Sequence, residues 1–235
     1  MTRRSFLMAV GILVLLVGIS AGALILLVRH EPADYMSSAI APGPERLQQS
    51  KRFKQNFAEM TNAWLSGNER PFEIKMTEAE INSYFAEDFL KSNLDRPLSE
   101  HNIRDPRVML KDDKLSLAFR YGKGLWSSVI TIVFNVWLPR QGDPNVIALE
   151  LQQLKAGSLP ISAQSLLKEI SRVAQENDID VSWYRHKGNP VALIRFQATN
   201  DQPTMRLERV MIKDGALTIR GRPATTIADN RRAQK

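Results

Sequence analysis

The sequence predicts an α+β protein, in which an N-terminal transmembrane helix precedes a curved antiparallel sheet wrapped around a helix. Three observations lead to this fold class. The chain opens with an uncharged, mostly apolar stretch at residues 5–28. After it, apolar residues recur at the helical period in three segments and alternate at the strand period in about eight others. Most of these strands are joined by short turns, which favours antiparallel pairing.

Residues 5–28 are long enough to cross a membrane as a helix. A helix of this length reaches roughly 36 Å, and the hydrocarbon core of a bilayer is about 30 Å thick. A cleaved secretory signal has a shorter apolar region, of about 7–15 residues, before a small-residue cleavage site. Cleavage after Ala23 would leave residues 24–28 as an apolar new terminus. We therefore expect an uncleaved anchor in the membrane.

The charges beside this stretch predict its orientation. Arg3 and Arg4 precede it, and the positive-inside tendency keeps such residues in the cytoplasm. Residues 1–4 are then cytoplasmic. The rest of the chain lies outside the cytoplasm, held in the inner (cytoplasmic) membrane by a single pass. Gly18 and Gly22 form a small-xxx-small pattern that would allow a weak homodimer, although glycine is common in membrane helices.

Composition divides the remaining chain into three parts. Residues 29–44 are rich in proline and small polar residues, which is typical of a linker. Residues 45–222 hold the regular elements and form one α+β domain. Residues 223–235 are predicted to be a flexible basic tail.

The domain begins with an amphipathic helix at residues 45–66 and a strand at residues 71–76. The helix carries an aromatic stripe, for which core packing is a simpler explanation than a ligand site. The stripe consists of Phe53, Phe57, Met60 and Trp64. Thr77 and Glu80 form a capping box, in which each side chain accepts a backbone N–H at the start of a second helix.

Alternation of apolar and polar residues predicts the sheet. The dipeptide Asp214-Gly215 marks a two-residue hairpin turn near the end of the domain. A third helix is predicted at residues 162–176. The predicted strands cover residues 108–110, 115–121, 126–138, 146–154, 179–184, 191–196, 205–213 and 216–220.

The strand at residues 126–138 is apolar on both faces. It needs cover on both, and few helices are available. A sheet curved around the helix at residues 162–176 would provide this cover. Alternatively, the second apolar face lines a ligand cavity or meets the membrane. The candidate lining residues are Ile130, Ile132, Phe134, Val136, Leu149, Leu151 and Leu166, each of which core packing also explains.

The sequence contains no catalytic signature. It has no cysteine, and its three histidines, His30, His101 and His186, lie far apart without metal-ligand spacing. Walker, dinucleotide and nucleophile-elbow patterns are missing. A helix cap, a helix surface and a turn explain the carboxylate pairs Glu78/Glu80, Glu87/Asp88 and Asp112/Asp113. We therefore expect no metal, no cofactor and no enzymatic activity.

The net charge of +7 is dispersed along the chain, as on an ordinary solvated surface. A nucleic-acid-binding footprint would need a basic patch or stripe. We therefore expect no nucleic-acid partner, whereas weak attraction to anionic lipid head groups is compatible with this charge.

The order of elements resembles bacterial YpmS-type and LmeA-type membrane-anchored proteins. The similarity lies in the anchor, a strand and capped helix at residues 72–85, the AGSLPI turn at residues 156–161 and the VMIKDGALTI hairpin at residues 210–219. It would cover about residues 70–222, and the helix at residues 45–66 departs from it. These families look like relatives of tubular lipid-binding folds, in which a curved sheet holds a long helix and an apolar groove. The resemblance implies no catalytic residue.

The leading functional expectation is a membrane-anchored, non-enzymatic envelope protein that binds a lipid or another apolar molecule. The alternative is a scaffold, or protein–protein interaction module of a membrane complex, that docks a partner through a sheet edge or a helical stripe. A hydrolase or sugar-modifying enzyme would need a polar cleft with convergent acids.

Overall fold

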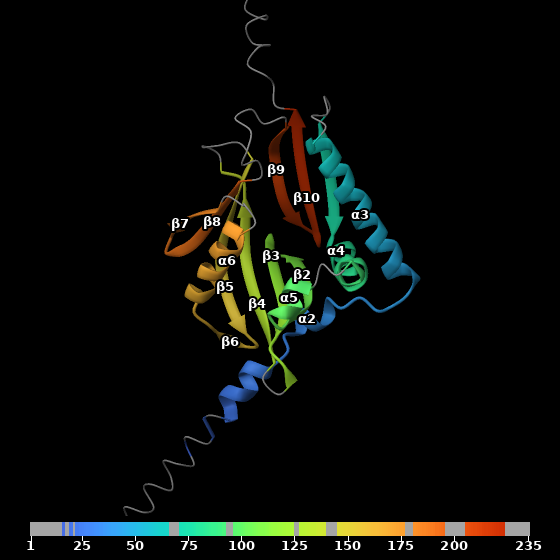
Figure 1. Ribbon diagram of the computed structural model, residues 1–235. Coiled ribbons are helices and arrows are strands. Elements are labelled where there is room, and N and C mark those ends of the chain that lie inside the picture. Colours follow the sequence, from blue (N-terminus) through green and yellow to red (C-terminus); the bar gives the residue numbers. More distant parts are fainter. Residues whose placement is uncertain are drawn as a thin grey trace, which may run out of the picture.

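The computed structural model describes residues 16, 19, 20, 22–65, 71–92, 96–124, 127–139, 145–176, 181–195 and 205–223. Strand is the commonest regular structure in this part of the chain, and the strands pair antiparallel in two sheets (Figure 1). The strands are β1 (Phe72–Thr77), β2 (Ile103–Lys111), β3 (Lys114–Tyr121), β4 (Ser128–Trp137), β5 (Val146–Ala156), β6 (Leu159–Pro160), β7 (Val181–His186), β8 (Asn189–Arg195), β9 (Met205–Lys213) and β10 (Ala216–Pro223). The helices are α2 (Ala33–Ser37), α3 (Pro44–Leu65), α4 (Glu78–Tyr84), the π-helix η1 (Phe85–Phe89), α5 (Arg96–Glu100) and α6 (Gln164–Glu176).

The smaller sheet has three strands in the order β1-β10-β9. Asp214 and Gly215 join β9 to β10 with positive φ angles of 53° and 69°, so the hairpin predicted from this dipeptide is confirmed. β1 pairs with the other side of β10, from Phe72 opposite Gly221 to Thr77 opposite Ala216. The first and last strands of the domain therefore lie side by side.

The larger sheet has seven strands, in the order β2-β3-β4-β5-β8-β7 with β6 paired to β5. Side chains alternate between its two faces. We call the inner face the one that carries Leu115, Leu117, Ile130, Ile132 and Phe134. We call the outer face the one that carries Lys114, Ser116, Ala118, Thr131 and Val133.

Two separate structures cover the inner face. Leu110 of β2 shares a hydrophobic cluster with Ile74 of β1 and Ile212 of β9, so this part of the face packs on the smaller sheet. Farther along, Leu167 of α6 packs against the cluster that contains Leu151 of β5. In Figure 1, α6 lies in front of β5, and the smaller sheet lies on the other side of the molecule beside α3.

The predicted fold class is wrong. The strands form two sheets instead of one curved sheet, and α6 covers part of one face instead of being enclosed. The physical reason is that the smaller sheet and the segment before α3 pack on the two faces of β4. The periodicity of the sequence does not predict which elements pack there. Among the described residues, no helix combines the length and the apolar character needed to cross a membrane. Most of residues 5–21 lie outside the described part of the chain.

The capping box at the start of α4 is confirmed. The Thr77 hydroxyl oxygen accepts the backbone N–H of Glu80 at 3.2 Å, and the Glu80 carboxylate accepts the N–H of Thr77 at 2.9 Å. Two of the N–H groups that a helix start leaves unpaired are thereby satisfied.

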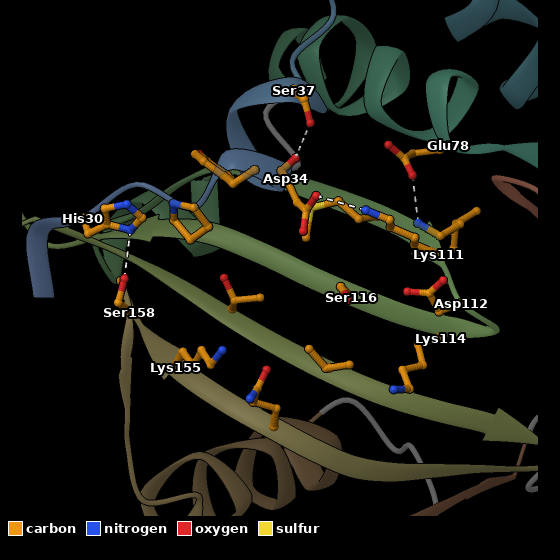
Figure 2. A pocket seen from close by; sticks show the side chains of 18 residues that line it. His30, Asp34, Ser37, Glu78, Lys111, Asp112, Lys114, Ser116, Lys155 and Ser158 are labelled. Atoms are coloured by element: carbon orange, nitrogen blue, oxygen red, sulfur yellow. Dashed lines mark hydrogen bonds and ion pairs between the residues drawn. The ribbon is translucent and has the colours of Figure 1, made fainter. Parts of the chain in front are cut away.

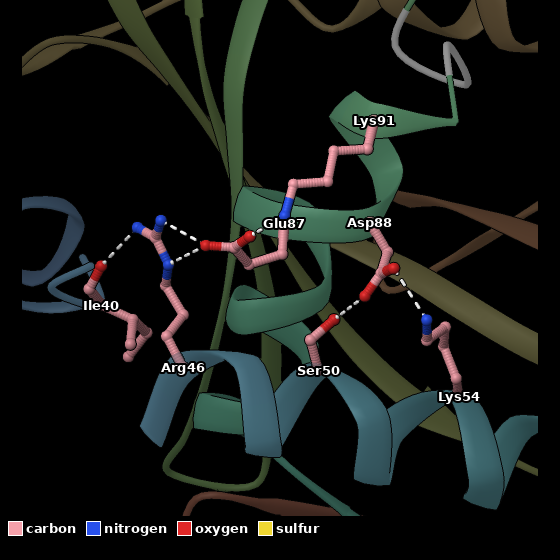
Figure 3. A network of polar contacts seen from close by, with 7 residues as sticks. All are labelled: Ile40, Arg46, Ser50, Lys54, Glu87, Asp88 and Lys91. Carbon is pink, nitrogen blue, oxygen red and sulfur yellow. Dashed lines mark hydrogen bonds and ion pairs between the residues drawn. The ribbon is translucent and has the colours of Figure 1, made fainter. Parts of the chain in front are cut away.

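Two carboxylates of η1 hold α3 in place (Figure 3). From α3, Arg46 contacts Glu87 at 2.7 Å, and Ser50 and Lys54 contact Asp88 at 2.5 Å and 2.7 Å. Lys91, one helical turn after Glu87, contacts Glu87 at 2.5 Å. The hydrogen bonds from Lys91 and Arg46 hold the pKa of Glu87 below its ordinary value. We expected Glu87 and Asp88 to lie on a helix surface, whereas in the structure both bind side chains of the neighbouring helix α3.

Helix α4 closes the free edge of β2. The Asn82 side chain donates to the carbonyl oxygen of Val108 and accepts its N–H, both at 2.8 Å. One turn earlier, the Glu78 carboxylate accepts the N–H of Leu110 at 2.8 Å. One helical turn rises about 5.4 Å and two strand residues span about 6.6 Å, so the two spacings match closely. The edge is thus satisfied by side chains and closed to other strands.

We predict that Asn82→Ala lowers the free energy of unfolding by about 2–4 kcal/mol, because it leaves two buried backbone groups of Val108 without partners. Urea unfolding of the full chain in neutral detergent, followed by circular dichroism, measures this loss. Asn62→Ala, at an exposed position of α3, is the control and should change little. Equal stability of Asn82→Ala and the parent chain would contradict the prediction.

Candidate functional site

The segment between the apolar stretch and α3 packs across the outer face. Tyr35 of α2 is 1% exposed and lies in a cluster with Met109, Ala118 and Val129. Its hydroxyl donates to the carbonyl oxygen of Asp105 at 3.0 Å, and the Arg107 guanidinium lies 4.1 Å from the ring centroid. Burial raises the pKa of Tyr35. Residues 29–44, which we expected to be a linker, therefore include a packed part of the fold.

The described chain is also helical at residues 22–29, which we call the N-terminal helix, and the carbonyl end of this helix is bonded to the larger sheet. The backbone N–H of Ser158, in the turn between β5 and β6, donates to the Leu27 carbonyl oxygen at 2.9 Å. The Ser128 hydroxyl donates to the Val28 carbonyl oxygen at 2.6 Å. The last carbonyl groups of a helix have no partner within the helix. The sheet supplies these partners and fixes the helix end against β4 and β5.

Gly157 permits this close approach. Its φ is +58°, and a Cβ atom there would collide with the carbonyl oxygens of Leu27 and Val28. Its own N–H donates to the Val129 carbonyl oxygen at 2.8 Å. Both the backbone conformation and the available space therefore require glycine.

Glu31 binds the segment between the apolar stretch and α3 to strand β3. Arg120 donates to the Glu31 carboxylate at 2.6 Å and lies 3.7 Å from the Asp105 carboxylate. The hydrogen bond from Arg120 holds the pKa of Glu31 below its ordinary value of 4.5. Because the Glu31 side chain is 38% exposed, the pair stabilises the fold by about 1 kcal/mol or less.

A groove of about 470 Å³ lies between this segment and the outer face (Figure 2). Strands β2 to β5 form its floor, and the N-terminal segment with the β5–β6 turn forms its side. Its volume falls within the range of about 300–1,000 Å³ that is usual for ligand pockets. The lining residues are His30, Pro32, Asp34, Tyr35, Ser37, Glu78, Met109, Leu110, Lys111, Asp112, Lys114, Ser116, Thr131, Val133, Gln153, Lys155, Gly157 and Ser158.

The floor of the groove is largely polar. Lys155 of β5 stands opposite Thr131 of β4, and Gln153 stands opposite Val133. Val133 in turn stands opposite Ser116 of β3. The Thr131 hydroxyl is buried and has no hydrogen-bond partner among the described residues. A buried hydroxyl without a partner costs about 1–3 kcal/mol, so this group would favour a bound donor or acceptor.

The charges of the groove are separated along its length. At one end, Lys111 lies 3.4 Å from the Asp34 carboxylate, and the β2–β3 turn adds Asp112 and Lys114. Lys155 lies at the other end, near Ser158 (Figure 2). It has no ion-pair partner within the described parts of the chain. The groove therefore has a mixed-charge end and an end at which Lys155 lies without an ion-pair partner among the described residues.

Ser158 and His30 form a hydrogen-bonded pair beside Lys155. The Ser158 hydroxyl oxygen lies 2.9 Å from Nδ1 of His30, and the pair is exposed. A serine nucleophile needs a histidine base that a third group orients. No such third group contacts His30 in the described part of the chain. The pair therefore closes one end of the groove without forming a catalytic triad.

The predicted lining residues lie on the opposite, inner face. Ile132, Phe134 and Leu151 are buried in one core cluster, and Ile130, Val136 and Leu149 pack against it. They do not line the groove. The side chain of Leu166 lies outside the described residues. The alternation that we identified in β4 is thus present, but its apolar face belongs to the core beneath α6.

Other predicted residues are dispersed. In the predicted stripe of α3, Phe53 and Met60 pack on the core, whereas Phe57 is 50% exposed. An added Cβ at Gly22 would meet no atom within 4 Å, while Gly18 lies outside the described residues, so self-association stays a prediction. The described residues contain no cluster of three or more potential metal ligands.

We did not predict the polar floor of the groove from the sequence. Ser116, Thr131, Gln153 and Lys155 occupy alternate positions on their strands, which is a signal for a shared polar face. Val129 and Val133 obscured it, because they make β4 apolar on both faces. Tyr35 carried no periodic signal, since α2 is only five residues long.

Comparison of the chain with protein-family models, curated proteins and solved structures finds no match. The resemblance to YpmS-type and LmeA-type proteins therefore stays a prediction.

We predict that Gly157→Ala loosens the N-terminal helix from the sheet, because the new Cβ collides with two backbone carbonyl groups. Hydrogen exchange at the Ser158 amide should accelerate at least tenfold, corresponding to a loss of about 1.4 kcal/mol in local stability. Gly124→Ala is the matched control, because Gly124 has a similar φ of +55° but open space around it. Similar exchange at Ser158 in the two variants would contradict the proposed steric role.

We predict that the contribution of Glu31 to stability depends on pH. Because its pKa is lower in the folded chain, the contribution is complete above the ordinary pKa of 4.5 and is lost as pH falls through the folded-state pKa. The parent chain should be more stable than Glu31→Gln at pH 7, and the difference should shrink below pH 4.5. Urea unfolding at several pH values tests this, with Glu59→Gln on α3 as the control. A constant difference across this range would contradict it.

Proposed function

We propose that this chain is a non-enzymatic, membrane-tethered envelope protein whose domain binds a lipid at the bilayer surface. The observation that carries the proposal is the direct bonding of the apolar segment to the rim of the groove. Leu27 and Val28 end the apolar stretch, and their carbonyl oxygens accept hydrogen bonds from Ser158 and Ser128. If the apolar stretch lies in a bilayer, a ligand in the groove would therefore lie at the surface of that bilayer.

The exposure of the apolar segment supports contact with a membrane. Leu24 and Leu26 are 50% and 72% exposed, and the sheet covers neither of them. Each Å² of apolar surface exposed to water costs about 25 cal/mol, and lipid removes this cost. With Arg3 and Arg4 on the cytoplasmic side, the groove would face the extracytoplasmic surface of the inner membrane.

The lining of the groove favours the head group of a lipid over its acyl chains. Lysines, hydroxyl groups and carboxylates are spread along the whole groove, and Met109, Leu110 and Val133 are among the apolar residues between them. The apolar residues that would suit an acyl chain are buried in the inner-face core. In the proposed complex, the head group occupies the groove while the chains remain in the bilayer.

A scaffold function is the second candidate, and the free edge of β7 favours it. β7 ends the larger sheet, and no strand among the described residues pairs with its outer side. Ser182 and Tyr184 on this strand are exposed. An exposed edge can accept a strand from another protein. Crosslinking in intact cells that captured one protein reproducibly, and no lipid, would favour this alternative.

Native mass spectrometry of the full chain, released gently in neutral detergent, tests lipid binding. We expect one bound lipid per chain. Ser116→Trp fills the floor of the groove and should remove this lipid, whereas Ser182→Trp adds the same bulk to the exposed edge and should retain it. Circular dichroism checks that both variants are folded. Repeated absence of lipid from the parent chain, without any delipidation step, would overturn the proposal.

A further inference from the structure

We infer that the end of the groove nearest the apolar segment is a site for a phosphate ester anion, with Lys155 as its charge partner. The inference rests on the proposed function, because it names the part of a lipid that the groove would recognise.

Two hydrogen-bond donors, Lys155 and Thr131, are neighbours on the floor of the groove. Lys155 and Thr131 are direct partners across β5 and β4, and both line the groove. Side chains in this relation have Cβ atoms about 4.5–5.5 Å apart. An ammonium group and a hydroxyl group can therefore contact one anion together. The Thr131 hydroxyl is buried and has no other partner in the described chain, so a change of its χ1 rotamer toward the groove would give it one in the anion.

The distribution of charged side chains along the groove also favours an anion at this end. The carboxylates of the groove lie at its other end, where Asp34 lies beside Lys111, Glu78 accepts the N–H of Leu110 and the β2–β3 turn carries Asp112. Figure 2 shows Lys155 at the opposite end, next to Ser158 and His30. The ammonium group of Lys155, which pairs with no carboxylate in the part of the chain that the structure describes, is thus separated from these carboxylates. Lysine binds phosphate as a compact point charge with three donors, which suits a monoanionic phosphodiester.

The carbonyl end of the N-terminal helix lies next to this site, and its partial negative charge is reduced by hydrogen bonds. A free helix C-terminus carries a partial negative charge that would repel an anion. Here the carbonyl oxygens of Leu27 and Val28 accept hydrogen bonds from Ser158 and Ser128. These bonds reduce the repulsion at the point where the anion would sit.

Lys155 also lies at a suitable depth relative to the membrane surface. Lys155 precedes Ser158 by three residues, a distance of at most about 10 Å along an extended chain. Ser158 itself is bonded to Leu27 near the end of the apolar stretch. The polar layer on each side of a bilayer is about 5–8 Å thick. The long side chain of Lys155 therefore reaches the level at which lipid phosphates lie.

Binding of two probes to the full chain in neutral detergent tests the inference. The probes are inorganic phosphate and a short-chain phosphatidylglycerol, and their affinities are measured by calorimetry. We expect Lys155→Gln to weaken phosphatidylglycerol binding about tenfold, as loss of one charge-assisted hydrogen bond predicts. Lys187→Gln, in the exposed turn between β7 and β8, is the matched control and should change affinity less than twofold. Thr131→Val should weaken binding severalfold without removing the charge.

The two probes separate the possible sources of the anion. Lys155-dependent binding of both probes, or of phosphatidylglycerol alone, supports a lipid head group. Lys155-dependent binding of inorganic phosphate alone supports the anion site with a soluble phosphate ester as its ligand. Binding of neither probe, or equal losses in Lys155→Gln and Lys187→Gln, overturns the site.

The same variants distinguish failure of the site from failure of the proposed function. If native mass spectrometry still finds one lipid on Lys155→Gln at the parent level, the groove binds lipid without this phosphate contact and only the inference fails. If the parent chain carries no lipid but binds phosphate through Lys155, the proposed function fails and the anion site stands.

Discussion

A helix that ends at a folded domain must find partners for its last carbonyl groups, and here the larger sheet provides them. The N–H of Ser158 and the hydroxyl of Ser128 bond to Leu27 and Val28, and Gly157 leaves the space in which this occurs. The remaining arrangement depends on this junction. It directs the following segment across the outer face, and that segment forms one side of the groove.

The two faces of the larger sheet differ because different structures cover them. On the inner face, the smaller sheet and α6 provide broad apolar contact, so β4 and β5 present Ile132, Phe134 and Leu151 to a dry core. On the outer face, a narrow segment packs through Tyr35 on Met109, Ala118 and Val129 and leaves the groove beside them open. The uncovered part can remain polar, because water or a ligand can reach it. A groove with lysine and hydroxyl groups therefore forms on a sheet whose other face is core.

Polar side chains also connect the elements that surround the core. Asn82 and Glu78 satisfy the edge of β2, while Glu87 and Asp88 hold α3 against η1. Each of these groups has a specific partner. Buried polar groups without partners are costly, so such contacts restrict how the helices can be placed. They provide orientation that apolar packing alone would leave less defined.

Local structure could be predicted from the sequence. Thr77 and Glu80 define the start of α4, Asp214 and Gly215 define the last hairpin, and the apolar stretch at residues 5–28 is plain from composition. Each of these depends on neighbouring residues, whose preferences can be read directly. The pairing of β1 with β10, the packing of Tyr35 on β4 and the groove shared by Lys155 and Thr131 could not be predicted in this way. These contacts join residues far apart in the chain. Many alternative pairings satisfy the same periodicity, and the choice among them depends on the packing of the whole molecule.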